Sequence, residues 1–287
     1  MELLIAAIVL LSAALHPARD SILRSDSRPS TAYLAMVIVV MLVSASHVVL
    51  TGKDLLSIVK VWPLAVIAVS SMALYSLSLI FTFSRGDLSI YYPITRSSPL
   101  FIVAVGVAFL GQTYSGTMLL GIGLVILGGF LLQHRPGERL IYEPTTLFFA
   151  LMVMASHGTG AIADGFAVRV IHPAVWFFWN WLLLSPILML LFRRIASTRI
   201  EWPPFAHWRR GWYRYLAGGG ALYASYYLML VAYSLGGNVA AVTAVRQASI
   251  PFAVLIGGTL LSEAAMTRRL LFSLVIAGGI VIIVLSE

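Results

Sequence analysis

Long apolar runs separated by short polar segments make up most of the chain. A helix that crosses the ~30 Å hydrocarbon core of a bilayer needs ~20 apolar residues. The runs are continuous rather than alternating, so they predict helices and not strands. We expect an all-α, polytopic membrane bundle of ten transmembrane helices, with eight or nine as the alternative count. The expected helices cover residues 2–23, 31–50, 62–84, 88–110, 116–132, 145–167, 173–192, 213–235, 238–261 and 267–286.

The second half of the chain repeats residues of the first half in the same order. Five helices per copy is an odd number, so the second copy would enter the membrane inverted, as in many secondary transporters. We therefore expect two inverted five-helix repeats, at residues 1–134 and 145–287. The matching residues are Ala73-Leu74-Tyr75 with Ala221-Leu222-Tyr223, Ser84 with Ser234, Gly86 with Gly236, Arg96 with Arg246, and His16 with His157.

Composition supports a membrane protein. Hydrophobic residues make up 60% of the chain and charged residues only 10%, whereas about a quarter of a soluble domain is charged. The net charge of +8 is read as membrane orientation rather than nucleic-acid binding. The absence of cysteine excludes disulfides, zinc-thiolate sites and a cysteine nucleophile, and it fits a bacterial inner membrane. The first apolar run begins with Glu2 and lacks a cationic start, so we expect it to stay in the mature protein.

Two arginines inside the predicted helices are the sharpest signal of function. Arg96 and Arg246 each lie about eight residues into a helix, which is ~12 Å deep. An unsatisfied arginine at a helix centre costs on the order of 2.5–3.5 kcal/mol. One interpretation is a site for a carboxylate or phosphate, which a guanidinium binds through its planar fork of donors. The alternative is a structural lock to a neighbouring acid or to backbone carbonyls.

Histidines paired with acids are the second signal. His16 and Asp20 are four residues apart, and His157 and Asp164 are seven apart, so each pair can share a helix face. A histidine near a carboxylate can titrate between about pH 5 and 8, which suits proton coupling. The alternative is a packing histidine that is hydrogen-bonded across helices. His47 has no charged partner in the sequence pattern and is interpreted as structural.

Aromatic residues could line a substrate pocket, although interfacial belts are the commoner reason for them. Prolines inside two helices, Pro93 and Pro99 in one and Pro251 in the other, predict kinks. Small residues in the fifth and tenth helices predict close helix packing or a homodimer seam. The aromatic and amide candidates for the pocket are Tyr92, Tyr223, Tyr227, Trp176 and Asn180.

Motifs of enzymes are missing. The sequence has no Walker A loop, no His-Glu-x-x-His and no Gly-x-Ser-x-Gly. We therefore expect no enzyme activity, no catalytic residues, no metal and no cofactor.

The chain resembles EamA-type members of the drug/metabolite transporter superfamily. The resemblance lies in 92–100 (Tyr-Pro-Ile-Thr-Arg-Ser-Ser-Pro-Leu), 245–249 (Val-Arg-Gln-Ala-Ser) and the end of the first helix at 14–20. It implies a ten-helix inverted-repeat transporter of amino acids or other small metabolites, often an exporter. It also implies a central cavity lined by helices 1, 3, 4, 6, 8 and 9, and here by His16, Tyr75, Arg96, His157, Tyr223 and Arg246.

The chain departs from this family pattern in three places. His16-Pro17-Ala18-Arg19-Asp20 stands where many relatives read His-Ala-x-Trp-Asn. Gly111-Gln112 stands where Gly-Glu is usual, and Ser262 precedes Glu263 in place of glycine. The altered first helix leaves the substrate open.

The distribution of basic residues predicts orientation. Alternate loops form two sides, and the side without the termini carries nearly all the basic residues. The positive-inside rule therefore places both termini outside, whereas relatives are usually drawn with both inside. The termini side has Lys53, Lys60 and Arg169; the other has Arg19, Arg24, Arg28, Arg85, Arg135, Arg139, Arg193, Arg194, Arg199, Arg209, Arg210, Arg214, Arg268 and Arg269.

The leading hypothesis is a secondary transporter of a small anionic or zwitterionic metabolite. Arg96 or Arg246 would hold the substrate, and His16, His157, Asp164 or Asp20 would couple protons. The partners would be the substrate, protons and the lipid bilayer. A non-transporting membrane scaffold or lipid-handling subunit is the alternative.

Overall fold

The computed structural model describes residues 1–24, 29–85, 88–133, 143–194, 212–254 and 266–286. These residues form helices and connecting turns, with no strand among them. The helices are α1 Leu3–Arg24, α2 Pro29–Leu50, η1 Leu55–Val61, α3 Trp62–Arg85, α4 Leu88–Thr95, α5 Ser98–Phe109, α6 Gly116–Gln133, α7 Pro144–Ala167, α8 Pro173–Arg194, α9 Trp212–Ser234, α10 Val239–Val245, η3 Arg246–Ala248 and α12 Met266–Leu285.

Eight of the ten expected spans are confirmed as continuous helices, each within two residues of its expected bounds. Within the described residues, four helices are long and apolar enough to cross a membrane, and five more apolar helices are shorter. Large apolar side chains remain exposed on the outer faces, among them Val66, Leu120 and Leu274. Such a surface is stable in lipid rather than in water.

The two remaining spans are interrupted rather than merely kinked. α4 ends at Thr95 and α5 begins at Ser98, so Arg96 and Ser97 lie between two half-helices. Pro99 has no N–H for the carbonyl of Thr95, which disrupts the helical ladder there. The Ser97 hydroxyl donates to the Pro93 carbonyl oxygen at 2.7 Å and so satisfies one group that the break exposes.

The second interruption lies at the matching place in the second half. α10 ends at Val245, η3 covers Arg246–Ala248, and helix resumes at residues 249–254. Pro251 cannot donate to the carbonyl of Gln247, and this favours the change of helix type. Each interruption therefore coincides with one of the two arginines of the predicted spans, Arg96 and Arg246, and both side chains are half-buried.

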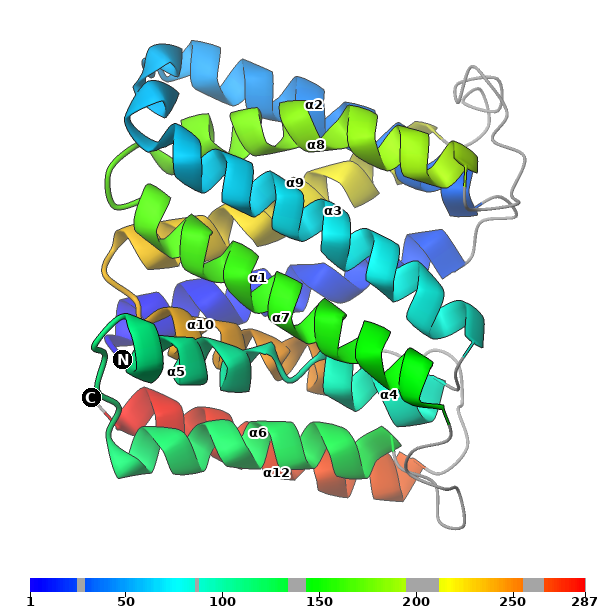
Figure 1. Ribbon diagram of the computed structural model, residues 1–287, viewed down its shortest axis with the longest axis vertical. Coiled ribbons are helices and arrows are strands. Elements are labelled where there is room, and N and C mark those ends of the chain that lie inside the picture. The colour runs from blue at the N-terminus through cyan, green and yellow to red at the C-terminus, as the bar shows by residue number, and fades with distance from the viewer. Residues whose placement is uncertain (25–28, 86–87, 134–142, 195–211, 255–265, 287) are drawn as a thin grey trace.

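Three long helix pairs organise the bundle: α3 lies along α7, α1 along α9, and α6 along α12 (Figure 1). α2 and α8 pack against each other and against α9 and α3, while α5 and α10 pack together beside α7. The interrupted spans are thus surrounded by continuous helices.

Glycines allow α6 and α12 to approach closely. A Cβ on Gly121 would lie 2.8 Å from the Gly279 carbonyl oxygen, and a Cβ on Gly279 would lie 2.7 Å from that of Gly121. Gly128 faces Ile276 in the same way. These three small residues serve packing within the chain, as expected, and the homodimer stays a prediction.

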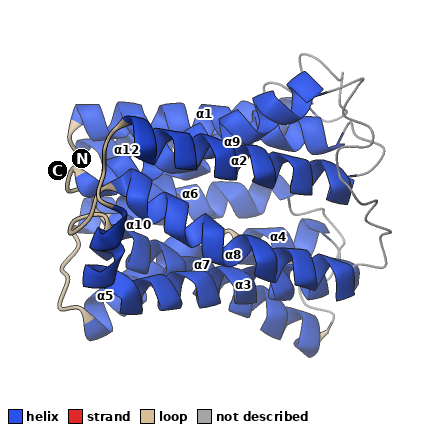
Figure 2. Ribbon diagram, turned by 90° about the horizontal axis from the view of Figure 1, so that it is seen from above, coloured by secondary structure: helices blue, strands red, loops and turns tan. Residues whose placement is uncertain are grey.

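Both termini lie at one end of the bundle in two perpendicular views (Figures 1 and 2). We call this the terminal end. It also holds the connections 51–54, 110–115, 168–172 and 235–238. At the opposite end, called the basic end, lie the ends of the described helices that flank the arginine-rich segments of the sequence. Described residues at these two ends include Lys53 and Arg169 at the terminal end, and Arg85 and Arg268 at the basic end.

Candidate functional site

The two interruptions meet in the middle of the bundle. Arg96 lies in the turn between α4 and α5, and Arg246 is the first residue of η3. The Gln247 side-chain amide donates to the backbone carbonyl of Arg96 at 3.0 Å, which joins one interruption to the other. The expected pair of arginines is therefore brought to one region, by a contact that the sequence did not indicate.

The Arg246 guanidinium is held by α9. It donates to the Met229 sulfur at 3.2 Å and to the Ser225 hydroxyl at 3.5 Å, and its Cζ lies 5.9 Å from the centre of the Tyr226 ring. Ser225 also donates to the Ser12 carbonyl oxygen at 2.8 Å, while the Ser12 hydroxyl donates to the Ser225 carbonyl oxygen at 2.5 Å. These contacts fix Arg246 against the α1–α9 pair.

Asp164 on α7 is a buried carboxylate with two strong donors. The Trp176 indole N–H donates to Oδ1 at 2.8 Å, and the Tyr226 hydroxyl donates to Oδ2. The positive charge of Arg246 acts on the same carboxylate. Trp176 is fully buried, so it does not belong to an interfacial aromatic belt. Tyr226 contacts both Arg246 and Asp164, and no sequence pattern singles it out, although it lies between the predicted pocket residues Tyr223 and Tyr227.

His157 lies within reach of both arginine charges. Its Nδ1 is 2.9 Å from the Ser98 hydroxyl at the start of α5, and its ring lies 5.6 Å from that of Tyr75. Both Arg246 and Arg96 act on it electrostatically. His157 and Asp164 share α7, as expected, but each has its own hydrogen-bond partners.

Tyr223 and Tyr227 belong to a second group, which we call the aromatic cluster: His47, His172, Tyr223 and Tyr227. The two tyrosine rings stack at 5.6 Å, Tyr223 is hydrogen-bonded to His47 Nδ1, and the His47 ring lies 4.9 Å from that of Tyr227. His172 stands at 6.5 Å from His47, towards the terminal end. His47 therefore has a polar role that its sequence position did not reveal.

The remaining candidates lie further from this contact network or outside it. The Asn180 amide donates to the carbonyl of Trp176 on its own helix at 3.0 Å. His16 is half-buried on α1, which packs against η3. The side chains of Asp20 and Tyr92 lie outside the described residues.

A small pocket reaches the first interruption. Its walls come from both interrupted spans and from α6, and it includes Arg96, Ser97 and Gln247.

Gln247 is a site residue that the sequence could have indicated, because it directly follows Arg246. In the described parts of the chain, no group of three or more acidic or histidine side chains could hold a metal ion.

Comparison with known proteins gives three findings. One solved structure, titled only "Crystal structure of protein", is 16% identical, covers 97% of this chain and 94% of its own, and superposes with a TM-score of 0.75. At this identity it shows the fold alone. No curated protein matches the sequence. Residues 1–133 match the EamA-like transporter family. The first 133 of the 287 residues are therefore similar to EamA-like transporters, and this match together with the apolar helices indicates a multi-pass membrane protein.

Proposed function

We propose that the chain is a secondary transporter that moves a small anionic or zwitterionic metabolite, such as an amino acid or a related compound, by alternating access. The observation that carries this proposal is the position of Arg96 and Arg246. Each stands at the interruption of a membrane span, and Gln247 joins the two interruptions. Interrupted helices at the centre of a transporter commonly provide the substrate site.

The chemistry of the centre favours a carboxylate or a phosphonate. Each guanidinium carries five N–H donors in a planar fork, and both arginines act on His157. Tyr75 packs near that histidine and lies on α3, which faces α7. We assign Arg96, Arg246, His157 and Tyr75 to the central substrate site, with His16 on the side of α1. The tyrosines of the aromatic cluster would meet the substrate nearer the terminal end.

The helix pairing supports two inverted repeats at residues 1–134 and 145–287. If the halves exchange places, α3 with α7 becomes α9 with α1, and α6 with α12 maps onto itself. These are the long pairs of the bundle. The interruptions at Arg96 and Arg246, which are equivalent under the same exchange, support the repeats as well.

Asp164 is our first choice for the coupling proton, with His157 as the second. Asp164 is buried near Arg246 and has a hydrogen bond to Tyr226. Protonation would remove the negative charge that balances this guanidinium and would release it towards a substrate anion. Asp164→Asn should therefore allow exchange of substrate across the membrane but abolish uptake driven by a pH gradient.

The test begins with the purified full-length chain and a thermal-shift screen of small carboxylates, phosphonates, amines and amino acids. A ligand that binds only the folded state raises its stability. Proteoliposomes should then move the compound that stabilises the protein. Arg96→Ala and Arg246→Ala should each abolish transport. Arg96→Lys keeps the positive charge but lacks the bidentate fork of donors, so it tests whether the charge alone is enough for transport.

Arg85→Ala is the matched control. Arg85 is exposed at the end of α3, where its Cζ lies 5.1 Å from the Phe81 ring. This substitution removes an arginine at the basic end and should leave transport nearly unchanged. Full transport by both central variants would refute the role of these arginines and would favour a scaffold or lipid-handling protein.

A further inference from the structure

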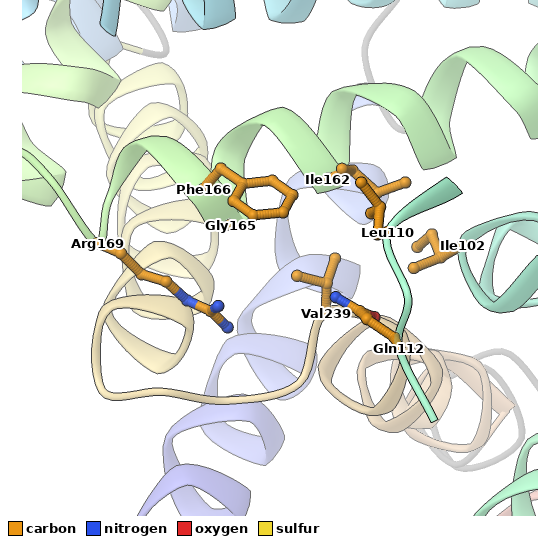
Figure 3. Close-up of a pocket in the computed structure, with 8 residues that line it drawn as sticks. All are labelled: Ile102, Leu110, Gln112, Ile162, Gly165, Phe166, Arg169 and Val239. Atoms are coloured by element: carbon orange, nitrogen blue, oxygen red, sulfur yellow. The ribbon is translucent and has the colours of Figure 1, made fainter. Parts of the chain in front are cut away.

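A pocket at the terminal end has two polar groups and otherwise apolar walls (Figure 3). Arg169 comes from the turn after α7, and Gln112 from the connection between α5 and α6. Ile162 and Phe166 of α7 and Val239 of α10 are among the apolar lining residues. The pocket thus combines a cation, an amide and a short hydrocarbon surface.

The Gln112 amide is oriented by Tyr114. The Tyr114 hydroxyl donates to Gln112 Oε1 at 2.6 Å, and burial raises the pKa of this tyrosine, which keeps its hydroxyl protonated. The oxygen of the amide is therefore occupied, and its NH₂ group faces Val239 and Arg169 (Figure 3). The backbone N–H of Gln112 donates to the Gly106 carbonyl at 2.9 Å and holds the connection in place.

Arg169 faces Gln112 across the pocket (Figure 3). One N–H of its guanidinium donates to the Gly237 carbonyl at 3.4 Å, which ties the side chain to the connection before α10. The side chain is exposed, and a guanidinium has further donors beyond this bond. Both polar groups therefore offer N–H donors to the pocket, so the complementary ligand is an acceptor with negative charge.

The pocket stands at the outer end of the two half-helices that reach the central site. α10 runs from Val239 in the pocket to Val245, beside Arg246. Seven residues of helix span ~10 Å. α5 runs from Ser98, beside the first interruption, to Phe109 near Gln112. A substrate between the centre and the terminal end would follow these same helices.

We propose that Arg169 and the Gln112 amide form a second anion-binding site, at the terminal-end mouth of the transport route, which takes the carboxylate of a small acid with a short apolar body. The identity of this ligand as the cargo rests on the proposed function. The affinity of the pocket for an anion does not depend on transport.

The absence of cysteine makes a direct test available. Phe166→Cys places a single thiol at the pocket of the full-length chain, purified in neutral detergent. Its labelling rate is measured with an anionic and a cationic methanethiosulfonate reagent of similar size. We expect the positive charge of Arg169 to increase the labelling rate of the anionic reagent. Arg169→Gln should therefore lower the ratio of the anionic to the cationic labelling rate about 10-fold.

Two further variants and a control sharpen the comparison. Gln112→Glu should lower the ratio at least as much, because it sets a carboxylate opposite the guanidinium, and Arg169→Lys should restore most of it. Lys53→Gln removes another exposed cation at the terminal end, away from α5 and α10 (Figure 1), and should change the ratio less than about twofold.

Benzoate serves as the ligand probe. It should slow the labelling of the Phe166→Cys protein, and Arg169→Gln should remove this protection. A ratio that none of the variants changes, or protection that survives Arg169→Gln, would overturn the proposal. Protection by phosphatidylglycerol but not by benzoate would also overturn it, because the ligand would then be a lipid headgroup. The same labelling in the Arg96→Ala background separates this test from transport, since the mouth should still bind benzoate there.

Discussion

At the residue scale, Asp164 shows how a buried charge is kept in this bundle. Two side-chain donors, Trp176 and Tyr226, reach its two oxygens, and Arg246 supplies the opposite charge. A carboxylate with this set of partners is stable in a membrane. Removal of one partner leaves part of the free-energy cost of its desolvation without a compensating interaction. The sequence supplies each residue, but their partnership spans α7, α8, α9 and η3.

The hydrogen bond from Tyr226 to Asp164 gives a stability prediction. Tyr226→Phe removes one donor to a charged group and should lower the free energy of unfolding by about 1.5–3 kcal/mol. The measurement is reversible unfolding in mixed detergent. Tyr213→Phe is the control, since Tyr213 is 60% exposed, and should have little effect. Equal effects of the two substitutions would contradict the role of Tyr226.

His172 gives a prediction for pH. Partial burial, with Lys53 and His47 nearby, lowers the pKa of His172 in the folded protein, and its Nδ1 accepts the backbone N–H of Ala174 at 3.2 Å. The fold thus favours the neutral ring. Its contribution to stability is present above the unfolded pKa of about 6.5 and is lost as the pH falls below it.

His172→Asn should therefore reduce the fall in unfolding temperature between about pH 7.5 and about pH 5. Asparagine can still accept the Ala174 N–H but does not titrate. Thermal unfolding of both proteins in one detergent checks this expectation. A pH dependence identical to that of the parent chain would exclude His172 as a contributor.

At the element scale, the interruptions and the glycine contacts set the architecture. Prolines mark both interrupted spans in the sequence and correctly indicate a disturbed helix. The prolines do not predict that the two interruptions contact each other. That contact is the hydrogen bond from the Gln247 amide to the carbonyl of Arg96, which joins residues 151 positions apart in the sequence. The α6–α12 contact likewise needs two glycines from opposite halves of the chain.

Gly279→Ala tests the α6–α12 contact. The added methyl group would meet the Gly121 carbonyl at 2.7 Å, so the helices must separate, and the free energy of unfolding should fall by about 1–3 kcal/mol. Gly123→Ala is the matched control, because nothing lies within 4 Å of its added Cβ. It should be neutral or slightly stabilising through helix propensity. A similar loss of unfolding free energy in both variants would contradict a special role of the Gly121–Gly279 contact.

At the scale of the whole molecule, the ends of the bundle differ in charge. Both termini share an end with Lys53, Lys60 and Arg169, while the helices that flank the arginine-rich segments of the sequence have their flanking ends at the other end. Since positive loops are retained in the cytoplasm, we expect the terminal end to face outwards. The lack of cysteine again allows a direct measurement.

Thr113→Cys and Thr145→Cys place single thiols at exposed positions of the terminal end and the basic end, respectively. In intact cells, a membrane-impermeant maleimide should label the first and not the second. Both should react after the cells are opened. A reporter fused after Glu287 that is active only in the cytoplasm should stay inactive. The reverse labelling pattern would place both termini inside.

Hydrophobicity along the chain was enough to predict the membrane class, eight of the ten helices as continuous spans, and charged candidates inside them. This was possible because a bilayer imposes one length and one polarity on every span. A charged residue such as Arg96 or Asp164 therefore stands out against an apolar background. Tyr226, His47 and Gln112 did not stand out, since a tyrosine, a histidine near a helix end and a glutamine in a turn are common there.

Which of these residues act together depends on the packing of the helices. Tyr226 matters because it touches both Arg246 and Asp164, and Gln112 because Tyr114 turns its amide towards Arg169. These relations depend on how helices distant in sequence pack and on how each side chain is oriented. Local hydrophobicity carries no information about either, because it fixes the depth of a residue in the membrane and not its neighbours.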